Sequence, residues 1–161
     1  MPKRGLFVAL VWVGVFIAPL PVLSQEDSGA LGPDIRFMAT LSADEETAPT
    51  ESPGSGCAVM VLVRETLEFS WKVTYSRLTS SAIGAHVHGP QNPGMNAGVL
   101  FDLASDGVKS PVNGSVILNE GQLKYILNRR TYVNIHTTNF PAGELRGQII
   151  RIRPEQEKVT C

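Results

Sequence analysis

The sequence predicts a single all-β domain, an antiparallel sandwich or barrel of about seven to eight short strands with Greek-key-like connections and one short helical turn. Three observations predict it. Apolar and polar residues alternate with a period of two in several stretches. Clusters of Gly, Pro, Asn and Ser separate these stretches. Finally, no helical stretch is long enough to cover a parallel sheet. The 161 residues, 43% of them hydrophobic, suffice for one domain with one core.

The two ends of the chain are expected to lie outside this domain. Residues 1–24 combine Lys3 and Arg4 with an apolar run and a small-residue site at Ser24, which predicts a signal peptide cleaved before Gln25. The run is too short for an ordinary membrane span, although an uncleaved signal anchor is the alternative. Residues 25–34 read as a flexible N-terminus and 154–161 as a charged tail. We therefore expect a secreted or extracytoplasmic domain over 35–153, with no membrane attachment after cleavage.

In the first half of the domain, three strands are expected. Residues 35–41 alternate, residues 43–56 are too polar to be other than a loop, and residues 58–63 form a continuous apolar run typical of a central strand. Residues 67–75 give the clearest pattern, with nine alternating positions. The expected inward-facing residues of that strand are Leu67, Phe69, Trp71, Val73 and Tyr75.

The second half is expected to contain five further strands and the helical turn. Residues 121–128 carry Leu123, Ile126 and Leu127 at helical spacing. Turn-forming residues at 89–94 separate the first two of the strands. The expected strands are residues 83–88, 99–103, 116–118, 132–137 and 145–152.

Charge and motif content exclude several function classes. The formal net charge is −1, and removal of Lys3 and Arg4 leaves 12 Lys and Arg against 15 Asp and Glu, a net charge of −3. We see no basic stripe or cluster in the sequence, so we expect no nucleic-acid binding. No nucleophile lies in a known catalytic setting, and no glycine-rich loop precedes a helix as phosphate binding requires. The sequence therefore favours a binding protein over an enzyme.

Two segments carry a family resemblance. The first is AHVHGP at residues 85–90, followed by GVLFDL at 98–103. The second is YVNIHT at 132–137, followed by PAGELRGQI at 141–149. With FMATLSA at 37–43 as an opening strand, the chain resembles the CHRD (chordin) domain family as a single-domain secreted member.

This resemblance implies a secreted β-rich domain that serves as an extracellular binding or interaction module. The expected partner is an extracellular protein or a matrix component. In chordin, growth-factor binding is mainly credited to cysteine-rich domains, and these are absent here, so that activity is not carried over. The fold is thus better specified by the resemblance than the function.

All three histidines of the chain lie within these two segments. His86 and His88 share one face of their strand, because residues two apart in a strand point the same way. His136 occupies the polar face of residues 132–137. If the two strands are neighbours, three imidazoles converge on the face away from the core, a workable geometry for copper or zinc. The alternate positions are apolar and are expected to face the core: Ile83, Ala85, Val87, Val133 and Ile135.

Two hypotheses for the histidines remain open. Residues 86–88 resemble one copper-binding strand of the copper–zinc superoxide dismutases, but that family has more histidine ligands and a zinc-binding aspartate, so a dismutase is not predicted. A simpler three-histidine site, with redox activity if it holds copper, is one hypothesis, and Met95 could approach a soft copper(I) ion there. The other is structural, in which the rings bond loop carbonyls and fix the glycine-rich connections.

Four further polar residues are candidates for an outer shell around the histidines. Asp102 or Glu144 could orient a ring, and Asn134 could satisfy backbone groups at the loops. Arg146 could pair with Glu144 or with Asp102. The alternative is an ordinary polar sheet face or a buried pair that sets register.

Covalent features are also expected. Cys57 and Cys161 are the two cysteines, and a disulfide between them would clamp the tail onto the domain. A buried free thiol or pairing with another chain is the alternative. Asn113 begins the sequon Asn-Gly-Ser and is a glycosylation candidate if the source is eukaryotic.

Overall fold

The fold was obtained as a computed structural model, and it describes residues 1, 32–48 and 50–153. The expected signal peptide and the expected tail lie outside these residues, apart from residue 1, and the expected N-terminal segment does so up to residue 31. No helix within the described ranges has the length and apolar character needed to cross a membrane.

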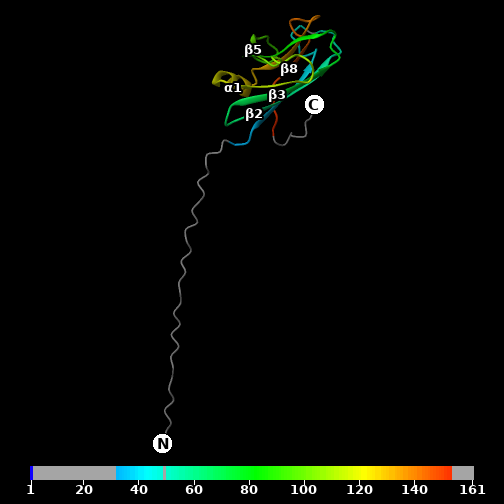
Figure 1. The fold of residues 1–161 in the computed structure, drawn as a ribbon. Helices are drawn as coiled ribbons and strands as arrows, with labels where there is room; N and C mark the ends of the chain where they lie inside the picture. The colour runs from blue at the N-terminus through cyan, green and yellow to red at the C-terminus, as the bar shows by residue number, and fades with distance from the viewer. Residues whose placement is uncertain (2–31, 49, 154–161) are drawn as a thin grey trace. The chain divides into compact units, whose positions relative to one another are not determined.

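The described part of the chain contains nine strands and one helix (Figure 1). The elements are β1 (Ile35–Ser42), β2 (Ser55–Val63), β3 (Glu68–Ser76), β4 (Ala82–His88), β5 (Val99–Asp102), β6 (Val112–Ile117), α1 (Glu120–Leu127), β7 (Tyr132–Thr137), β8 (Leu145–Gln148) and β9 (Ile150–Arg151).

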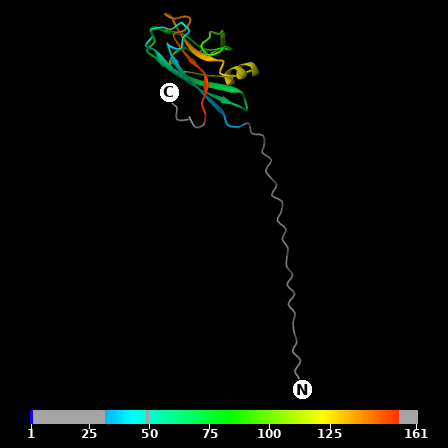
Figure 2. The same ribbon diagram turned by 180° about the vertical axis from the view of Figure 1, so that it is seen from behind.

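All strand pairs are antiparallel and belong to one curled sheet, in the order β5-β4-β7-β8-β1-β2-β3-β6, with β9 beside β1. The only β8–β1 register pair is Ser42 with Arg146, so this narrow junction divides the sheet into two groups of strands. The inner faces of the two groups pack together in one core, and Figure 2 shows the curled ribbon from behind. The ring of Phe101 on β5 lies 6.2 Å from Phe69 and 5.9 Å from Trp71, both on β3. The predicted all-β antiparallel fold is confirmed.

The period of two places the core as predicted. Along β1, burial alternates, and Phe37 and Leu41 are each 1% exposed. On β3, Phe69 and Val73 are fully buried, and the Trp71 indole N–H donates to the Leu103 carbonyl at 3.0 Å. Burial of these large apolar side chains on both groups is the main force that holds the curl closed.

Four strand predictions need correction. The strand expected at residues 116–118 is β6, which begins at Val112 because it pairs with β3 from that residue onward. Leu67 does not begin β3, because its positive φ of 57° places it in the preceding turn. Ile83 does not face the core but is 52% exposed, because the β4–β7 register shifts between Ala82 and Gly84. The last predicted strand divides into β8 and β9, since the Ile149 N–H turns to bond the Thr131 carbonyl.

The helical turn lies close to its predicted position. Helix α1 begins after Asn119, whose side chain accepts from the Gln122 N–H while the Gln122 side chain accepts from the Asn119 N–H. This reciprocal capping satisfies two backbone donors at the start of a helix too short to be stable alone. Ile126 is the helical residue that inserts into the core.

Candidate metal centre

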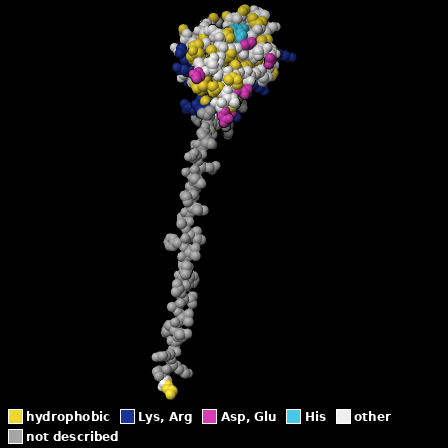
Figure 3. Space-filling view, turned by 60° about the vertical axis from the view of Figure 1, so that its left-hand side comes forward, with side chains coloured by type: hydrophobic (Ala, Val, Ile, Leu, Met, Phe, Trp, Pro, Cys, Tyr) yellow, Lys and Arg dark blue, Asp and Glu magenta, His cyan; other side chains and the backbone are white. Residues whose placement is uncertain are grey.

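The three histidines come together on the outer face of neighbouring strands β4 and β7. Across the pair, Gly84 lies opposite His136, and His88 lies opposite Tyr132. The intervening residues of both strands, Ala85, Val87, Val133 and Ile135, are 0% exposed on the inner face. One ring nitrogen from each histidine lies within 4.8 Å of those of the others. Figure 3 shows the histidine atoms reaching the surface as a small group.

Two of the rings are fixed by loop carbonyls. The Nδ1 atom of His88 lies 3.0 Å from the Ala97 carbonyl oxygen, and the Nδ1 atom of His136 lies 3.0 Å from the Pro141 carbonyl oxygen. A carbonyl oxygen only accepts, so each Nδ1 must carry the proton. A neutral imidazole has one N–H, which leaves both Nε2 atoms as acceptors with a free lone pair.

These two Nε2 atoms lie only 3.3 Å apart. Burial lowers the pKa of His136 to about 4, and it also lowers the pKa of His88, with the neighbouring His86 adding to both effects. Both rings are therefore neutral at neutral pH, and a proton shared between them would place a positive charge where burial disfavours it. Two acceptors thus face one another 3.3 Å apart.

A metal ion would resolve this arrangement. Zinc–imidazole bonds are about 2.0–2.1 Å long, so two nitrogens of a tetrahedral site lie roughly 3.3–3.4 Å apart. The separation of the His88 and His136 Nε2 atoms is 3.3 Å. The two rings are thus already spaced as ligands, and their Nδ1–carbonyl bonds are the outer contacts that metal-binding histidines ordinarily make.

His86 supplies the third nitrogen from the edge of the group. Its Nε2 atom lies 4.0 Å from an Asp102 carboxylate oxygen, across the β4–β5 pair, while its Nδ1 atom is buried without a hydrogen-bond partner. Because the ligand set spans up to 4.8 Å, closing on an ion requires His86 to move inward by about 1 Å.

Tyr132 is a residue of this site that the sequence analysis did not single out. Its ring stacks on His88 at an interplanar angle of 8°, and its hydroxyl accepts from the Ala97 N–H at 3.1 Å. The Arg146 guanidinium covers the ring, 3.5 Å from its centre. Tyr132 and His136 are four residues apart in one strand, so their side chains point to the same face, and this spacing could have identified Tyr132.

Gly84 also went unrecognised. A Cβ atom there would lie 3.0 Å from the His86 ring and 3.8 Å from the His136 ring. A side chain at this position would crowd the His86 ring, so a glycine two residues before the H-x-H pair keeps room for it.

Arg146 pairs with neither of its predicted acidic partners. It is 2% exposed and donates to the Met95 carbonyl at 2.9 Å and the Asn96 side chain at 3.1 Å. It therefore holds the loop between β4 and β5 against the sheet. The Met95 side chain, by contrast, is 55% exposed.

Asn134 belongs to a buried polar group beside the histidines, between His86 and Arg146 in register. Burial raises the pKa of Glu46, while the positive charge of Arg146 and a hydrogen bond from Asn134 oppose the rise. One Glu46 oxygen and the Asn134 carbonyl oxygen are buried without a partner, and both crowd the space beside Gly143.

Glu144 is fully buried, yet it contacts hydroxyl and amide donors rather than a histidine ring. It accepts from Ser52, from the Thr79 backbone and side chain, and from Thr137, at 2.6–2.9 Å. Its place in the fold is to join two loops to the end of β7. Of the predicted outer-shell carboxylates, Asp102 is the one that faces a histidine.

The structure describes only some of the residues of the predicted disulfide and glycosylation site. Cys57 lies on β2, but Cys161 is outside the described residues, so their disulfide stays a prediction. Asn113 is exposed on β6, at one end of the sheet order, and its glycosylation likewise stays a prediction.

Comparison with known proteins identifies the family. The model of the CHRD domain matches residues 37–149, which is more than half of the chain, runs from within β1 to the end of β8 and includes all three histidines. No curated protein and no solved structure gives a match. The expected resemblance is confirmed, and the chain belongs to the CHRD domain family.

Proposed function

We propose that this protein is an extracellular CHRD-type interaction module that holds one transition-metal ion, copper or zinc, through His86, His88 and His136. CHRD membership supports the interaction role at the level of the family. The metal is supported by one observation above all. The unprotonated Nε2 atoms of His88 and His136 lie 3.3 Å apart, at the spacing of two metal ligands.

The donor set restricts the metal. Three neutral imidazoles suit zinc and copper, whereas calcium and magnesium require oxygen ligands. Copper(II) binds more tightly than zinc(II) at a given nitrogen site, so we expect copper to displace zinc. Three protein ligands leave a position for water or an anion, and bound copper could then exchange electrons with a small molecule at that position.

Titration of the tag-free protein with zinc(II) and copper(II) tests the proposal. Calorimetry at neutral pH should show one equivalent bound, and His86→Ala should weaken the binding. Less than one equivalent in the fully folded protein, or an unchanged affinity in His86→Ala, would show that the histidines serve another purpose.

Asp102 gives a finer prediction. Asp102→Asn should weaken metal binding by about tenfold, because the carboxylate oxygen 4.0 Å from the His86 Nε2 atom loses the negative charge that favours a nearby cation. The measurement is competitive titration against a chromogenic chelator. Asp106→Asn, an exposed aspartate in the following loop, is the matched control and should leave the affinity unchanged. Equal affinities of the two variants would remove Asp102 from the site.

A metal-free interaction module is the second candidate. The bonds from His88 to Ala97 and from His136 to Pro141 support it, because they anchor two surface loops without any ion. If the protein binds no metal, this is the function that remains. Partner capture by metal-free protein, undiminished by a chelator, would favour it.

A further inference from the structure

A second surface, separate from the histidines, gathers arginines that are distant in sequence. A pocket of about 250 Å³ lies where β1 begins and β9 ends. Four arginines line it, and Asp34 is the one acidic residue of the lining, so the net charge there is +3. The arginines are Arg36, Arg64, Arg151 and Arg153. The expectation that the chain has no basic cluster is therefore wrong.

Strand pairing creates this cluster. Arg151 on β9 lies opposite Phe37 of β1, and the Ile152 N–H donates to the Arg36 carbonyl at 2.8 Å. Arg64 directly follows β2, whose Leu62 lies opposite Ile35. The start of β1, the end of β2 and the end of β9 thus lie close together, although they are far apart in the chain. Their positive charge contrasts with the net charge of −1 of the whole sequence.

Two of the arginines have no acidic partner in the described part of the chain. Neither Arg64 nor Arg151 forms a salt bridge there. The Nε atom of Arg64 is also buried without a hydrogen-bond partner. Arg36 and Arg153 make further contacts of their own, so they contribute positive charge to the surface. Arg64 and Arg151 are the two arginines of the pocket that remain available to an anionic ligand.

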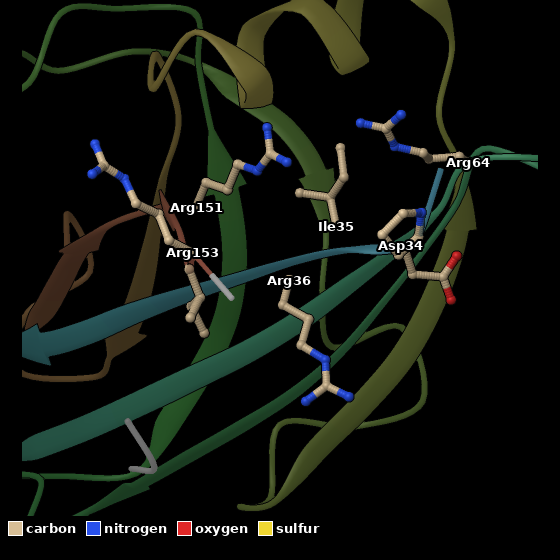
Figure 4. A pocket seen from close by; sticks show the side chains of 8 residues that line it. Asp34, Ile35, Arg36, Arg64, Arg151 and Arg153 are labelled. Atoms are coloured by element: carbon tan, nitrogen blue, oxygen red, sulfur yellow. The ribbon is translucent and has the colours of Figure 1, made fainter. Parts of the chain in front are cut away.

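The directions of the side chains indicate the kind of ligand. In Figure 4, Arg64 and Arg151 extend on the same side as Ile35, whereas Arg36 extends on the other side of the β1 ribbon. Four guanidiniums spread in this way cannot enclose one small anion. They suit a ligand that carries several anionic groups along a chain, each able to accept two parallel hydrogen bonds from one guanidinium.

We propose that this arginine surface binds a sulfated polysaccharide. No lining residue is aromatic, so the surface lacks the stacking platforms with which proteins hold single-stranded nucleic acids. Sulfate groups along a sugar chain need only the guanidinium forks. The inference gives a chemical class to the partner of the proposed interaction module, and it does not depend on the metal.

Heparin oligosaccharides are the probe, and metal-free full-length mature protein is the sample. The wild-type protein should bind heparin with an affinity that falls as salt is raised. Combining Arg64→Gln with Arg151→Gln should weaken binding by about tenfold and reduce the salt dependence, because two charge contacts are lost. Arg151→Gln alone, at an exposed position, should show part of the loss if the double variant folds poorly.

Controls separate this surface from general charge effects and from the histidines. Arg77→Gln, at the far end of the β2–β3 pair, should bind heparin as the wild type does, and so should His136→Ala. Desulfated heparin should bind weakly. An unchanged affinity in the arginine variants, an equal loss in Arg77→Gln, or equally tight binding of single-stranded DNA would overturn the proposal.

Discussion

His136→Ala is expected to abolish stoichiometric metal binding while leaving the metal-free fold intact. The substitution removes one of two nitrogens that stand 3.3 Å apart. Changes to residues that only support a ligand cost 10–100-fold in affinity, so the loss of a ligand should cost at least about 100-fold. In the metal-free protein the substitution relieves the facing acceptors but also removes the hydrogen bond from the His136 Nδ1–H to the Pro141 carbonyl, so it should cost about 1–2 kcal/mol of unfolding free energy and leave the fold intact.

Two denaturation curves for each protein measure this. With metal at 100 times its dissociation constant, the wild type should gain about 2.7 kcal/mol in unfolding free energy, and His136→Ala should gain almost nothing. Met95→Ala is the control for zinc, since its side chain is exposed and the Met95 carbonyl that Arg146 binds is retained. A variant that keeps the full metal-dependent gain would refute the role assigned to His136.

Glu144→Ala should be the most destabilising substitution among the polar residues considered. The carboxylate is 0% exposed and accepts four hydrogen bonds, from Ser52, Thr79 and Thr137. Alanine leaves these donors unpaired in a buried place, which should cost about 3–5 kcal/mol of unfolding free energy. Urea denaturation at neutral pH measures it. Glu45→Ala, an exposed glutamate of the loop after β1, should cost almost nothing.

The charge of Glu144 can be separated from its shape with Glu144→Gln. Burial alone would raise the pKa of this carboxyl, but the hydrogen bonds from Ser52, Thr137 and Thr79 outweigh it and hold the pKa below its ordinary value. Because the pKa of Glu144 is lower in the folded state, its ionised form stabilises the protein at pH values above about 4.5, the ordinary carboxyl pKa. This stabilisation is lost as the pH falls through the pKa of the folded state.

The wild type should therefore exceed Glu144→Gln in stability at pH 7, and the gap should narrow below about pH 4.5. A gap that stays constant down to pH 3 would mean that the ionised form is not the one that the hydrogen bonds favour. A loss of less than about 1 kcal/mol in Glu144→Ala would contradict the burial of its donors.

Most of the fold could be predicted because each strand carries its own signal. Alternation in β1 and β3 reflects a sheet with one face on the core, and it needs no knowledge of distant residues. The errors occur where contacts with other segments determine which way a side chain faces or where a strand begins. Ile83 has the correct parity for the core, but a register shift against β7 turns it outward. Leu67 continues the apolar alternation of β3, but its positive φ places it in the turn before that strand.

The convergence of the histidines could be predicted from their alternating positions in two strands, but the protonation of their ring nitrogens could not. Metal binding by His88 and His136 requires that each Nδ1 atom carry the proton, and the Ala97 and Pro141 carbonyls, from two separate loops, decide that. The sequence contains no pattern for such backbone contacts. The arginine surface was missed for a related reason. Arg64 and Arg151 are far apart in sequence, and the pairing of both β2 and β9 with β1 brings them together.

Diffraction from metal-loaded crystals, recorded at the absorption edge of the metal, tests the central claim most directly. The account predicts one strong anomalous peak about 2.0–2.1 Å from the Nε2 atoms of His88 and His136 and from one ring nitrogen of His86. Absence of a peak at these nitrogens in crystals soaked with copper or zinc, with the two Nε2 atoms still 3.3 Å apart, would contradict it.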